Sequence, residues 1–228
     1  MQRPQLSIII PTLNEAQEIE THLVSLLGLW VCGSEIIVVD GGSQDQTVAL
    51  ASPLASRVLV CEPGRALQMN IGANASQGNY LLFLHADTRL PKRADKLISS
   101  ALTRRAWGRF DVKLSGRHAM LKVVAGAMNL RSRLTGIATG DQAIFMTRQA
   151  FDAAGGFPEQ PLMEDIEMSA RLRRLSPPTC LHHRVTSSGR RWMRNGLWRT
   201  ILLMWRLRYR YWRGMDSHSL ANHYRHVR

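Results

Sequence analysis

The first ninety residues alternate between short apolar runs and segments with apolar residues at helical spacing, and this alternation constrains the fold more than any other feature. The apolar runs predict four strands over residues 6–10, 35–39, 57–61 and 80–84. Helices are predicted behind Asn14, over 47–51 and over 66–75. Strands that alternate with helices in this way are typical of a doubly wound, mostly parallel α/β sheet with flanking helices.

The rest of the chain continues the mixed pattern, although its middle is harder to interpret. A helix is predicted from Pro91 to about Arg104, a strand where Phe110, Val112 and Leu114 alternate, and a helix over 119–128. A further strand is predicted over 143–146 and a helix over 164–175. With 228 residues, the chain is long enough to bury one substantial core.

Two of the predicted strands end in an aspartate. Asp40 follows the second apolar run and precedes Gly41 and Gly42, and Asp87 follows the fourth run after His85. Open α/β sheets bind ligands at the carboxyl ends of their strands, so we expect Asp40 and Asp87 to converge on one crevice. There Asp40 would contact a base or ribose and Asp87 a cation on phosphates, while the glycines let a nucleotide approach the backbone. The structural alternative for Asp40 is that it only caps the next segment.

Two further positions carry charge at predicted helix starts. Arg65 follows Gly64, where its guanidinium and the free backbone N–H groups can face an anion together. A surface ion pair with Glu62 is the alternative. Glu164 and Asp165 open a later helix, where a carboxylate could act as a general base or simply favour the helix N-terminus.

Five ordered segments together closely resemble the family-2 glycosyltransferases of GT-A fold, nearest to a short bacterial subgroup with GRALQMN and HADT motifs. The segments are Pro11 to Glu15, Asp40 to Thr47, Gly64 to Asn70, His85 to Asp87, and Glu164-Asp165. The resemblance extends through Trp192. It divides the chain into a glycosyltransferase domain over 1–192 and a basic, Trp- and Arg-rich helical extension over 193–228.

The resemblance implies an inverting transferase that moves a sugar from a nucleotide-diphosphate donor, expected to be UDP-linked, to an unidentified acceptor. Asp165 would deprotonate the acceptor hydroxyl, and Glu164 would position the acceptor or support the loop. Further roles are implied on the donor side. Pro11 and Glu15 would line the nucleotide pocket together with Asp40 and Gly42, Arg65 would lie beside the diphosphate, and Asn70 would stabilise the loop or sugar pocket.

The family's metal motif is present only in part. Its usual pattern is Asp-x-Asp, and this chain has His85-x-Asp87. We therefore expect Mn²⁺ or Mg²⁺ to be held by Asp87, by diphosphate oxygens and by water. His85 is a less natural ligand than an oxygen donor, and it could equally be a histidine hydrogen-bonded at a strand end.

The acceptor side is predicted from two segments that resemble the family. Gly140, Asp141 and Gln142 match the acceptor-side segment, in which Asp141 and Gln142 would hydrogen-bond a sugar. Arg191 and Trp192 resemble part of the signature of processive relatives, with Arg191 at the diphosphate and Trp192 stacked on the acceptor. Ser188 stands where those relatives have Gln, which argues against a polymerising synthase.

The net charge of +13 at pH 7 is concentrated toward the end of the chain. There a predicted helix places apolar residues on one face and arginines beside it, which is typical of a helix lying in a membrane interface. The apolar residues are Trp198, Ile201, Leu202, Trp205, Tyr209 and Trp212, and the arginines are Arg199, Arg206, Arg210 and Arg213. A lipid-linked acceptor would suit such a helix. Alternatively, the face packs on the catalytic domain or on a second subunit, as in a homodimer.

Other classes of function fit less well. A sugar-1-phosphate nucleotidylyltransferase would have a Gly-rich, Arg-containing loop after the first strand, and a dinucleotide oxidoreductase would have G-x-G-x-x-G there. This chain has neither pattern, because Pro11 to Glu15 follow its first predicted strand. The three cysteines indicate neither a disulfide framework nor a zinc site. We find no signal-peptide pattern and no apolar stretch of about 20 residues, so we expect a cytoplasmic protein with peripheral membrane contact at most. The remaining alternative is an inactive, transferase-like basic module that binds a membrane surface or, less favoured, nucleic acid.

Overall fold

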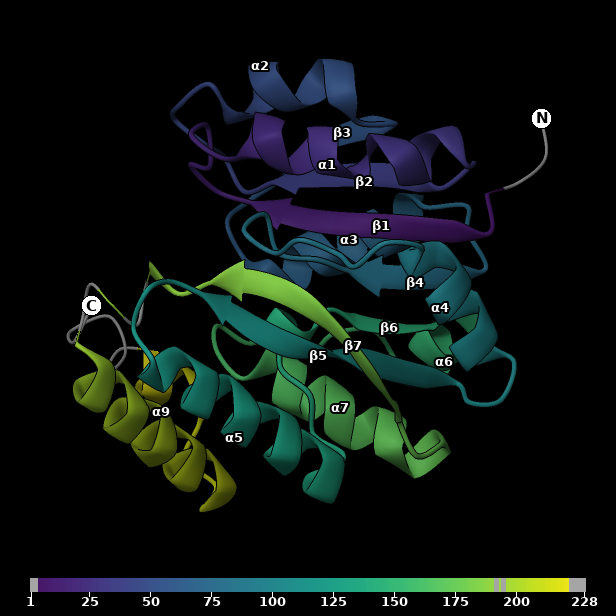
Figure 1. Ribbon diagram of the computed structural model, residues 1–228. Helices are drawn as coiled ribbons and strands as arrows, with labels where there is room; N and C mark the ends of the chain where they lie inside the picture. Colours follow the sequence, from purple (N-terminus) through teal and green to yellow (C-terminus); the bar gives the residue numbers. More distant parts are fainter. Residues whose placement is uncertain (1–3, 191–192, 194–195, 222–228) are drawn as a thin grey trace.

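A seven-stranded sheet forms the centre of the computed structural model, which describes residues 4–190, 193 and 196–221. The strand order is β3-β2-β1-β4-β6-β5-β7 (Figure 1). The strands are β1 (Leu6–Thr12), β2 (Glu35–Asp40), β3 (Arg57–Val60), β4 (Tyr80–Phe83), β5 (Trp107–Ser115), β6 (Ile144–Thr147) and β7 (Thr179–Ser188). β6 pairs antiparallel with β4 and with β5, and the other pairs are parallel. The predicted mostly parallel α/β sheet is confirmed.

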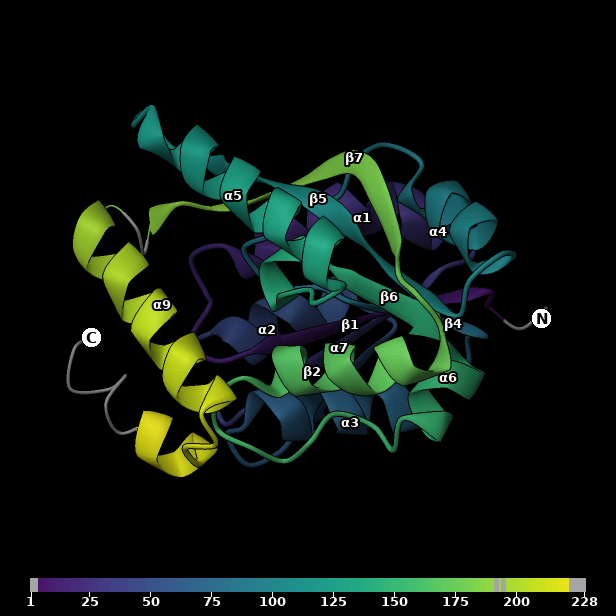
Figure 2. The ribbon, with the colours of Figure 1, turned by 90° about the horizontal axis from the view of Figure 1, so that it is seen from below.

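Helices cover both faces of this sheet (Figures 1 and 2). They are α1 (Ile19–Val31), α2 (Thr47–Ala51), α3 (Arg65–Ala75), α4 (Ala94–Leu102), α5 (Met120–Thr135), α6 (Arg148–Ala153), α7 (Glu164–Leu175) and α9 (Leu197–Trp212), with short 3₁₀ turns η1 (Ser52–Leu54) and η2 (Gly140–Gln142). In the part of the chain that is described, no helix combines the length and apolarity needed to cross a bilayer.

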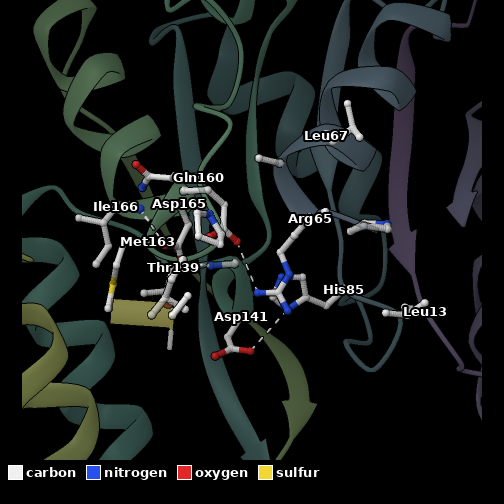
Figure 3. Close-up of a pocket in the computed structure, with 18 of the residues that line it drawn as sticks. Leu13, Arg65, Leu67, His85, Thr139, Asp141, Gln160, Met163, Asp165 and Ile166 are labelled. Carbon is white, nitrogen blue, oxygen red and sulfur yellow. Dashed lines mark hydrogen bonds and ion pairs between the residues drawn. The ribbon is translucent and has the colours of Figure 1, made fainter. Parts of the chain in front are cut away.

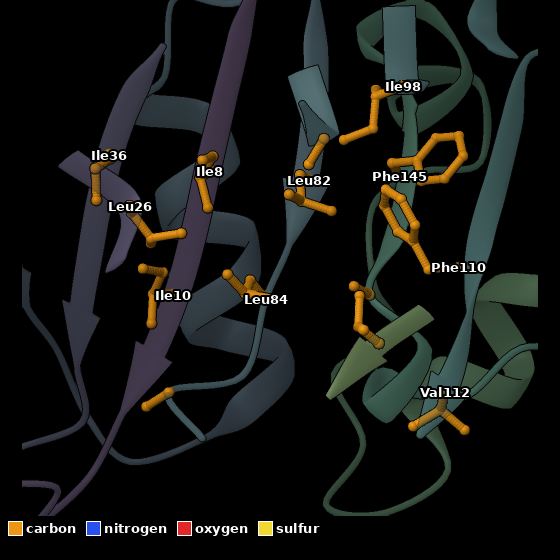
Figure 4. Packing of buried hydrophobic residues seen from close by; sticks show 14 of the residues in the cluster. Ile8, Ile10, Leu26, Ile36, Leu82, Leu84, Ile98, Phe110, Val112 and Phe145 are labelled. Atoms are coloured by element: carbon orange, nitrogen blue, oxygen red, sulfur yellow. The ribbon is translucent and has the colours of Figure 1, made fainter. Parts of the chain in front are cut away.

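Side chains alternate across the strands and so build a separate core on each face of the sheet. Ile8 and Ile10 of β1 join the cluster beneath α1, α4 and α5, which Figure 4 shows together with Phe110 and Phe145. Ile9, between them, joins the opposite cluster beneath α3, α6 and α7. Strands buried on both faces read as continuous apolar runs, which is why the first strands were visible in the sequence.

The structure differs from the sequence-based expectation mainly after residue 110. The helix predicted over 119–128 continues to Thr135 and ends at Gly136, whose φ of +66° is the left-handed conformation that favours glycine. Its second half carries polar residues that face inward, such as Ser132, which accepts a hydrogen bond from buried Arg109 at 3.0 Å. β7 and α6 were not predicted. β7 lies at the edge of the sheet beside β5 and exposes His182, so it lacks the pattern of a buried strand.

The C-terminal helix α9 packs against the loop before α7. Leu207 of α9 is 1% exposed and forms a third apolar cluster with Met163 and with Leu220, which follows α9. Ile201 also reaches the core beneath α5. The face of α9 that the sequence marked as apolar nevertheless stays largely in solvent, since Trp198, Trp205 and Trp212 are about two-thirds or more exposed.

Candidate active site

A cavity of about 1090 Å³ opens at the carboxyl ends of β1 and β4. Its walls are the loops after these strands, the first turn of α3, η2, the loop before α7 with the first turn of that helix, and one face of α9. Segments from both ends of the chain therefore meet there. Most of the residues predicted to bind donor or acceptor line this cavity, and Figure 3 shows how Arg65, His85, Asp141 and Asp165 lie in it. The lining residues among them are Pro11, Glu15, Arg65, His85, Asp87, Gly140, Asp141, Glu164 and Asp165.

Asp165 lies deep in the cavity at the start of α7. The backbone N–H of Gly140 donates to its Oδ2 at 2.9 Å, and the N–H of Ile166 donates to Oδ1 at 2.8 Å. Burial, reinforced by the negative charge of Glu164, raises the pKa of Asp165 to about 6. A fixed carboxylate with a pKa near neutrality suits a general base, because its conjugate acid forms readily.

Glu164 and Arg65 form an ion pair across the cavity. Arg65 Nη1 lies 3.5 Å from Glu164 Oε1, and the two side chains are 49% and 6% exposed. Arg65 thus lines the cavity from the first turn of α3, and the pair joins the start of α3 to the start of α7. Its contact with a diphosphate stays a prediction. Glu164 therefore contacts Arg65, and its expected role in positioning the acceptor or supporting the loop stays a prediction.

Gly140 is closely packed against the side chains of His85 and Asp165. A Cβ at this position would fall on the imidazole of His85, far inside van der Waals contact. The His85 ring in turn lies beside Asp141, with Nδ1 3.6 Å from Oδ1 (Figure 3). Ser187 Oγ donates to the same Asp141 oxygen at 3.2 Å. The absence of a side chain at 140 therefore allows β4's end, η2 and α7 to meet.

A second acidic group, Glu15, lines the cavity from the loop after β1. Burial and the nearby charge of Asp87 raise the pKa of Glu15, while Arg190 acts in the opposite direction. Arg190 also forms an ion pair with Glu18 at 2.6 Å. Asp87 and Glu15 are therefore close enough to repel each other, and a cation between Asp87 and an incoming diphosphate would offset that repulsion.

The cavity offers carboxylate oxygens of Asp87 to a divalent ion but too few protein ligands to complete its coordination. Among the described residues, no group of three His, Cys, Asp or Glu side chains could hold a metal ion by itself. Asp87 offers carboxylate oxygens, the donors that Mn²⁺ and Mg²⁺ prefer, whereas Nδ1 of His85 faces Asp141. An ion here fits only if diphosphate oxygens and water supply its remaining ligands.

Asp40 is placed differently from our expectation. It is 1% exposed and does not line the cavity. Its Oδ2 accepts hydrogen bonds from the N–H groups of Gly42 and Ser43 at 3.0 and 2.7 Å, and Oδ1 accepts from Ser43 Oγ and Thr12 Oγ1. Asp40 therefore does not join Asp87 in the lining of this cavity. Asp40 shapes the loop after β2, in which Gly42 has a φ of +82°, and direct contact of either residue with a nucleotide stays a prediction.

Two other predicted residues support the cavity from behind. Asn70 bonds both backbone groups of Phe157, donating to its O at 2.9 Å and accepting from its N at 2.8 Å, and so fixes the loop that leads to α7. Gln142 is fully buried and closes the capping box of η2 with Thr139. It therefore does not reach a sugar in this arrangement.

Two of the predicted residues lie outside the described part of the chain, and two residues that line the cavity were not predicted. Arg191 and Trp192 lie outside the described residues, so their roles stay predictions. Met204 and Arg208 of α9 line the cavity, which the sequence did not indicate. Their apolar and basic character is shared with the whole helix, so only the docking through Leu207 singles them out.

The C-terminal end of α3, away from the cavity, is hydrogen-bonded by a positively charged side chain. Arg148 donates to the carbonyl oxygens of Ala73, Ser76 and Gly78 at 3.0–3.1 Å, and so covers the last turn of the helix with positive charge. The first turn of α3, in contrast, opens onto the cavity at Gly64, Arg65 and Ala66.

Comparison with known proteins places this geometry in context. The family model "Glycosyl transferase family 2" matches residues 7–151. A PGL/p-HBAD biosynthesis glycosyltransferase of Mycobacterium tuberculosis (strain H37Ra) is 39% identical over 98 residues, which cover 40% of this chain and 38% of the relative. The uncharacterized glycosyltransferase YibD of Escherichia coli K12 is 30% identical over 105 residues, or 43% of this chain and 30% of YibD. The matched part is thus well under half of each relative.

Solved structures agree over more of the chain. S. aureus TarS 1–349 in complex with UDP-GlcNAc superposes with a TM-score of 0.62 at 18% identity, covering 81% of this chain and 58% of TarS. The mannosyltransferase PcManGT from Pyrobaculum calidifontis, in complex with GDP-Man and Mn²⁺, superposes with a TM-score of 0.59 at 20% identity, covering 82% of this chain and 57% of PcManGT. At these identities the likeness concerns the fold.

Proposed function

Because this chain belongs to glycosyl transferase family 2 and has the GT-A fold, we propose that it transfers a sugar from a nucleotide-diphosphate donor to an acceptor hydroxyl with inversion. A UDP-linked donor is the first candidate, since a structural neighbour was solved with UDP-GlcNAc, and a GDP-linked donor is the second. The acceptor is unidentified, and transfer of a hexose is the form we test first.

One observation carries the proposal more than any other. The cavity places a half-buried carboxylate, Asp165, with its pKa raised to about 6, opposite the guanidinium of Arg65 at the open end of α3. A base and an anion-binding group on facing walls are what an inverting displacement requires, because nucleophile and leaving group must lie on opposite sides of the reacting carbon.

In this mechanism Asp165 accepts the proton of the acceptor hydroxyl while the hydroxyl oxygen bonds to the anomeric carbon of the donor. The bond from that carbon to the diphosphate oxygen breaks, and its electron pair leaves with the nucleotide diphosphate. Gly140 N–H holds Asp165 in the orientation that reaches the hydroxyl. Arg65 and the first N–H groups of α3 stabilise the charge that develops on the diphosphate.

Asp87 would be the residue that holds a divalent ion, which would supply positive charge to stabilise the leaving diphosphate. His85 would contribute mainly through its contact with Asp141, which keeps the acceptor wall next to the end of β4. Glu15 and Pro11 would face the nucleoside half of the donor from the loop after β1.

Asp165→Asn tests the proposal. With UDP- and GDP-sugars and Mn²⁺, the wild type is expected to release nucleoside diphosphate, by transfer or slow hydrolysis. Asp165→Asn should lower kcat by about 10²–10⁴-fold, the usual contribution of a general base. Asp152→Asn, on the exposed side of α6, is the matched control and should keep wild-type activity.

Two results would contradict the assignment. Full activity of Asp165→Asn would exclude Asp165 as the base. No release from any nucleotide-sugar, with Asp87→Ala indistinguishable from wild type, would instead favour the inactive, transferase-like binding module.

A further inference from the structure

The two sides of α9 have different surroundings. Leu207 and Thr200 are buried against the domain, and Met204 and Arg208 line the cavity. On the opposite side, five large apolar side chains lie between 60% and 77% exposed. They are Trp198, Leu202, Trp205, Tyr209 and Trp212, spaced four, three, four and three residues apart along one stripe of the helix.

The opposite side of α9 is packed: Leu207 belongs to an apolar cluster with Met163 and Leu220, and Ile201 packs against the core beneath α5. The exposed stripe therefore lies on the side that remains open after the helix has docked. At 100° per residue, Arg199, Arg206 and Arg213 lie together along one border of the stripe. Within the described residues, none of these three arginines forms an ion pair or a side-chain hydrogen bond. A row of unpaired cations therefore flanks a row of exposed aromatic rings.

A second helix adds to the same side of the molecule. α5 exposes Val123, Leu130 and Leu134 at 59%, 59% and 77%, with exposed Ala127 between them at helical spacing. α5 and α9 lie on the same side of the molecule, below the sheet in Figure 1 and toward the viewer in Figure 2, with α7 beside them. We call the exposed stripes of α5 and α9, with the flanking arginines, the two-helix face.

The chemistry of this face favours one occupant. Neither α5 nor α9 contains an acidic residue. A second copy docked symmetrically on the face would therefore bring its own arginines and no carboxylate from either helix. Nucleic acid would satisfy the arginines but would leave the aliphatic side chains of α5 uncovered. A bilayer with anionic lipids satisfies both, because Trp and Tyr rings settle at the headgroup level and arginines meet lipid phosphates.

We propose that the two-helix face binds the surface of an anionic lipid bilayer. α9 would lie in the interface plane, with the aromatic stripe at the acyl boundary and the arginine row among the headgroups. Because the same helix walls the cavity, the bilayer would lie within about one helix diameter, 10–12 Å, of the cavity. The binding does not require the transferase activity, so either proposal can fail alone.

Co-sedimentation of the full chain with vesicles tests this directly. Binding is expected to vesicles of phosphatidylcholine and phosphatidylglycerol in equal parts, to weaken steeply with salt, and to be slight with phosphatidylcholine alone. Transfer of tryptophans to the interface should also shift their fluorescence to the blue.

Two sets of variants separate the aromatic from the ionic contribution. The W198S/W205S variant should lower partitioning by at least about tenfold. The R199Q/R206Q/R213Q variant should lower it by roughly a hundredfold at low salt, since each arginine near such a surface contributes about fivefold. Matched controls are V31S/V60S, which removes equally exposed apolar residues elsewhere, and K96Q/R104Q/R105Q, which removes exposed cations around α4. Both controls should bind like wild type.

The proposal is overturned if the wild type ignores anionic vesicles at low salt. It is also overturned if the aromatic variant binds as well as its control, or if DNA binding that needs only the arginines replaces vesicle binding. A dimer in solution that W198S/W205S converts to monomer, without vesicle binding, would assign the face to a second copy. Circular dichroism checks that each variant is folded, and the comparison of lipids with wild-type protein needs no variant.

Discussion

Asp165 shows how local geometry sets the chemistry of a single residue. Its two carboxylate oxygens are fixed by backbone N–H groups of Gly140 and Ile166, while its surroundings disfavour the charged form. The carboxylate is therefore well oriented and more basic than an exposed aspartate. Both properties follow from its place in the first turn of α7, against η2.

The pH dependence of the reaction should report this pKa. A general base works only when deprotonated, so kcat/KM is expected to fall with unit slope as the pH drops through about 6, the raised pKa of Asp165. The measurement is the pH dependence of kcat/KM for the donor, determined at a saturating concentration of acceptor. A flat profile between pH 5 and 8 would contradict the raised pKa.

Substitutions of the two neighbouring charged residues, Glu164 and Arg65, should shift the acidic limb of the pH profile, where kcat/KM falls at low pH, in opposite directions. Glu164→Gln removes a negative charge that raises the pKa of Asp165, so the limb should shift to lower pH. Arg65→Met removes a positive charge that lowers this pKa, so the limb should shift to higher pH. Because the two variants are each compared with wild type, a shift of both in one direction would show that they act through altered structure instead.

Gly140→Ala should be disproportionately damaging for so small a change. The added methyl group would overlap the His85 ring, which must then leave its place beside Asp141. We expect activity to fall at least about tenfold and the protein to lose roughly 1–3 kcal/mol of stability, as in overpacked sites. The double variant His85→Ala/Gly140→Ala removes the overlap and should recover the stability, measured by urea unfolding, although not the activity.

At the scale of elements, one side chain joins α3 to the loop before α7. Asn70→Ala would leave the backbone N–H and C=O of buried Phe157 without these partners, at a cost of about 1–3 kcal/mol. The loop that carries one wall of the cavity should then loosen, raising KM as well. Asn74→Ala, exposed on the same helix, is the control for helix propensity and should change the midpoint of urea unfolding little.

How far the sequence predicts these elements depends on which side chains each one buries. β1, β2 and β4 bury both faces, so their apolar runs predicted them within a residue or two. β7 escaped prediction because its exposed His182, His183 and Arg184 hide the alternation. The site followed the same rule. Strand ends and helix starts predicted Asp87, Arg65 and Asp165, but no local pattern distinguishes an aspartate that faces a cavity from Asp40, which faces its own loop.

At the scale of the whole molecule, the cavity is closed only because distant segments pack together. A ligand that bridges α3, η2 and α7 should therefore stabilise the fold as a unit. A nucleoside diphosphate with Mn²⁺ at 100 times its Kd adds about 2.7 kcal/mol, which should raise the Tm by roughly 5–10 °C for a chain of this size. Asp87→Ala should abolish the part of this shift that depends on metal. An equal shift with and without metal would separate Asp87 from ion binding.

The partial charges at the two ends of α3 are offset to different degrees by neighbouring groups. Arg148 covers the carbonyl end, whereas the amide end is open to the cavity, so the helix presents an uncancelled positive pole there. Small oxyanions in the solvent should collect at that pole whether or not they resemble a substrate. Sulfate and phosphate buffers are thus expected to compete with the nucleotide-sugar donor, and an assay run in them would underestimate the proposed transferase activity.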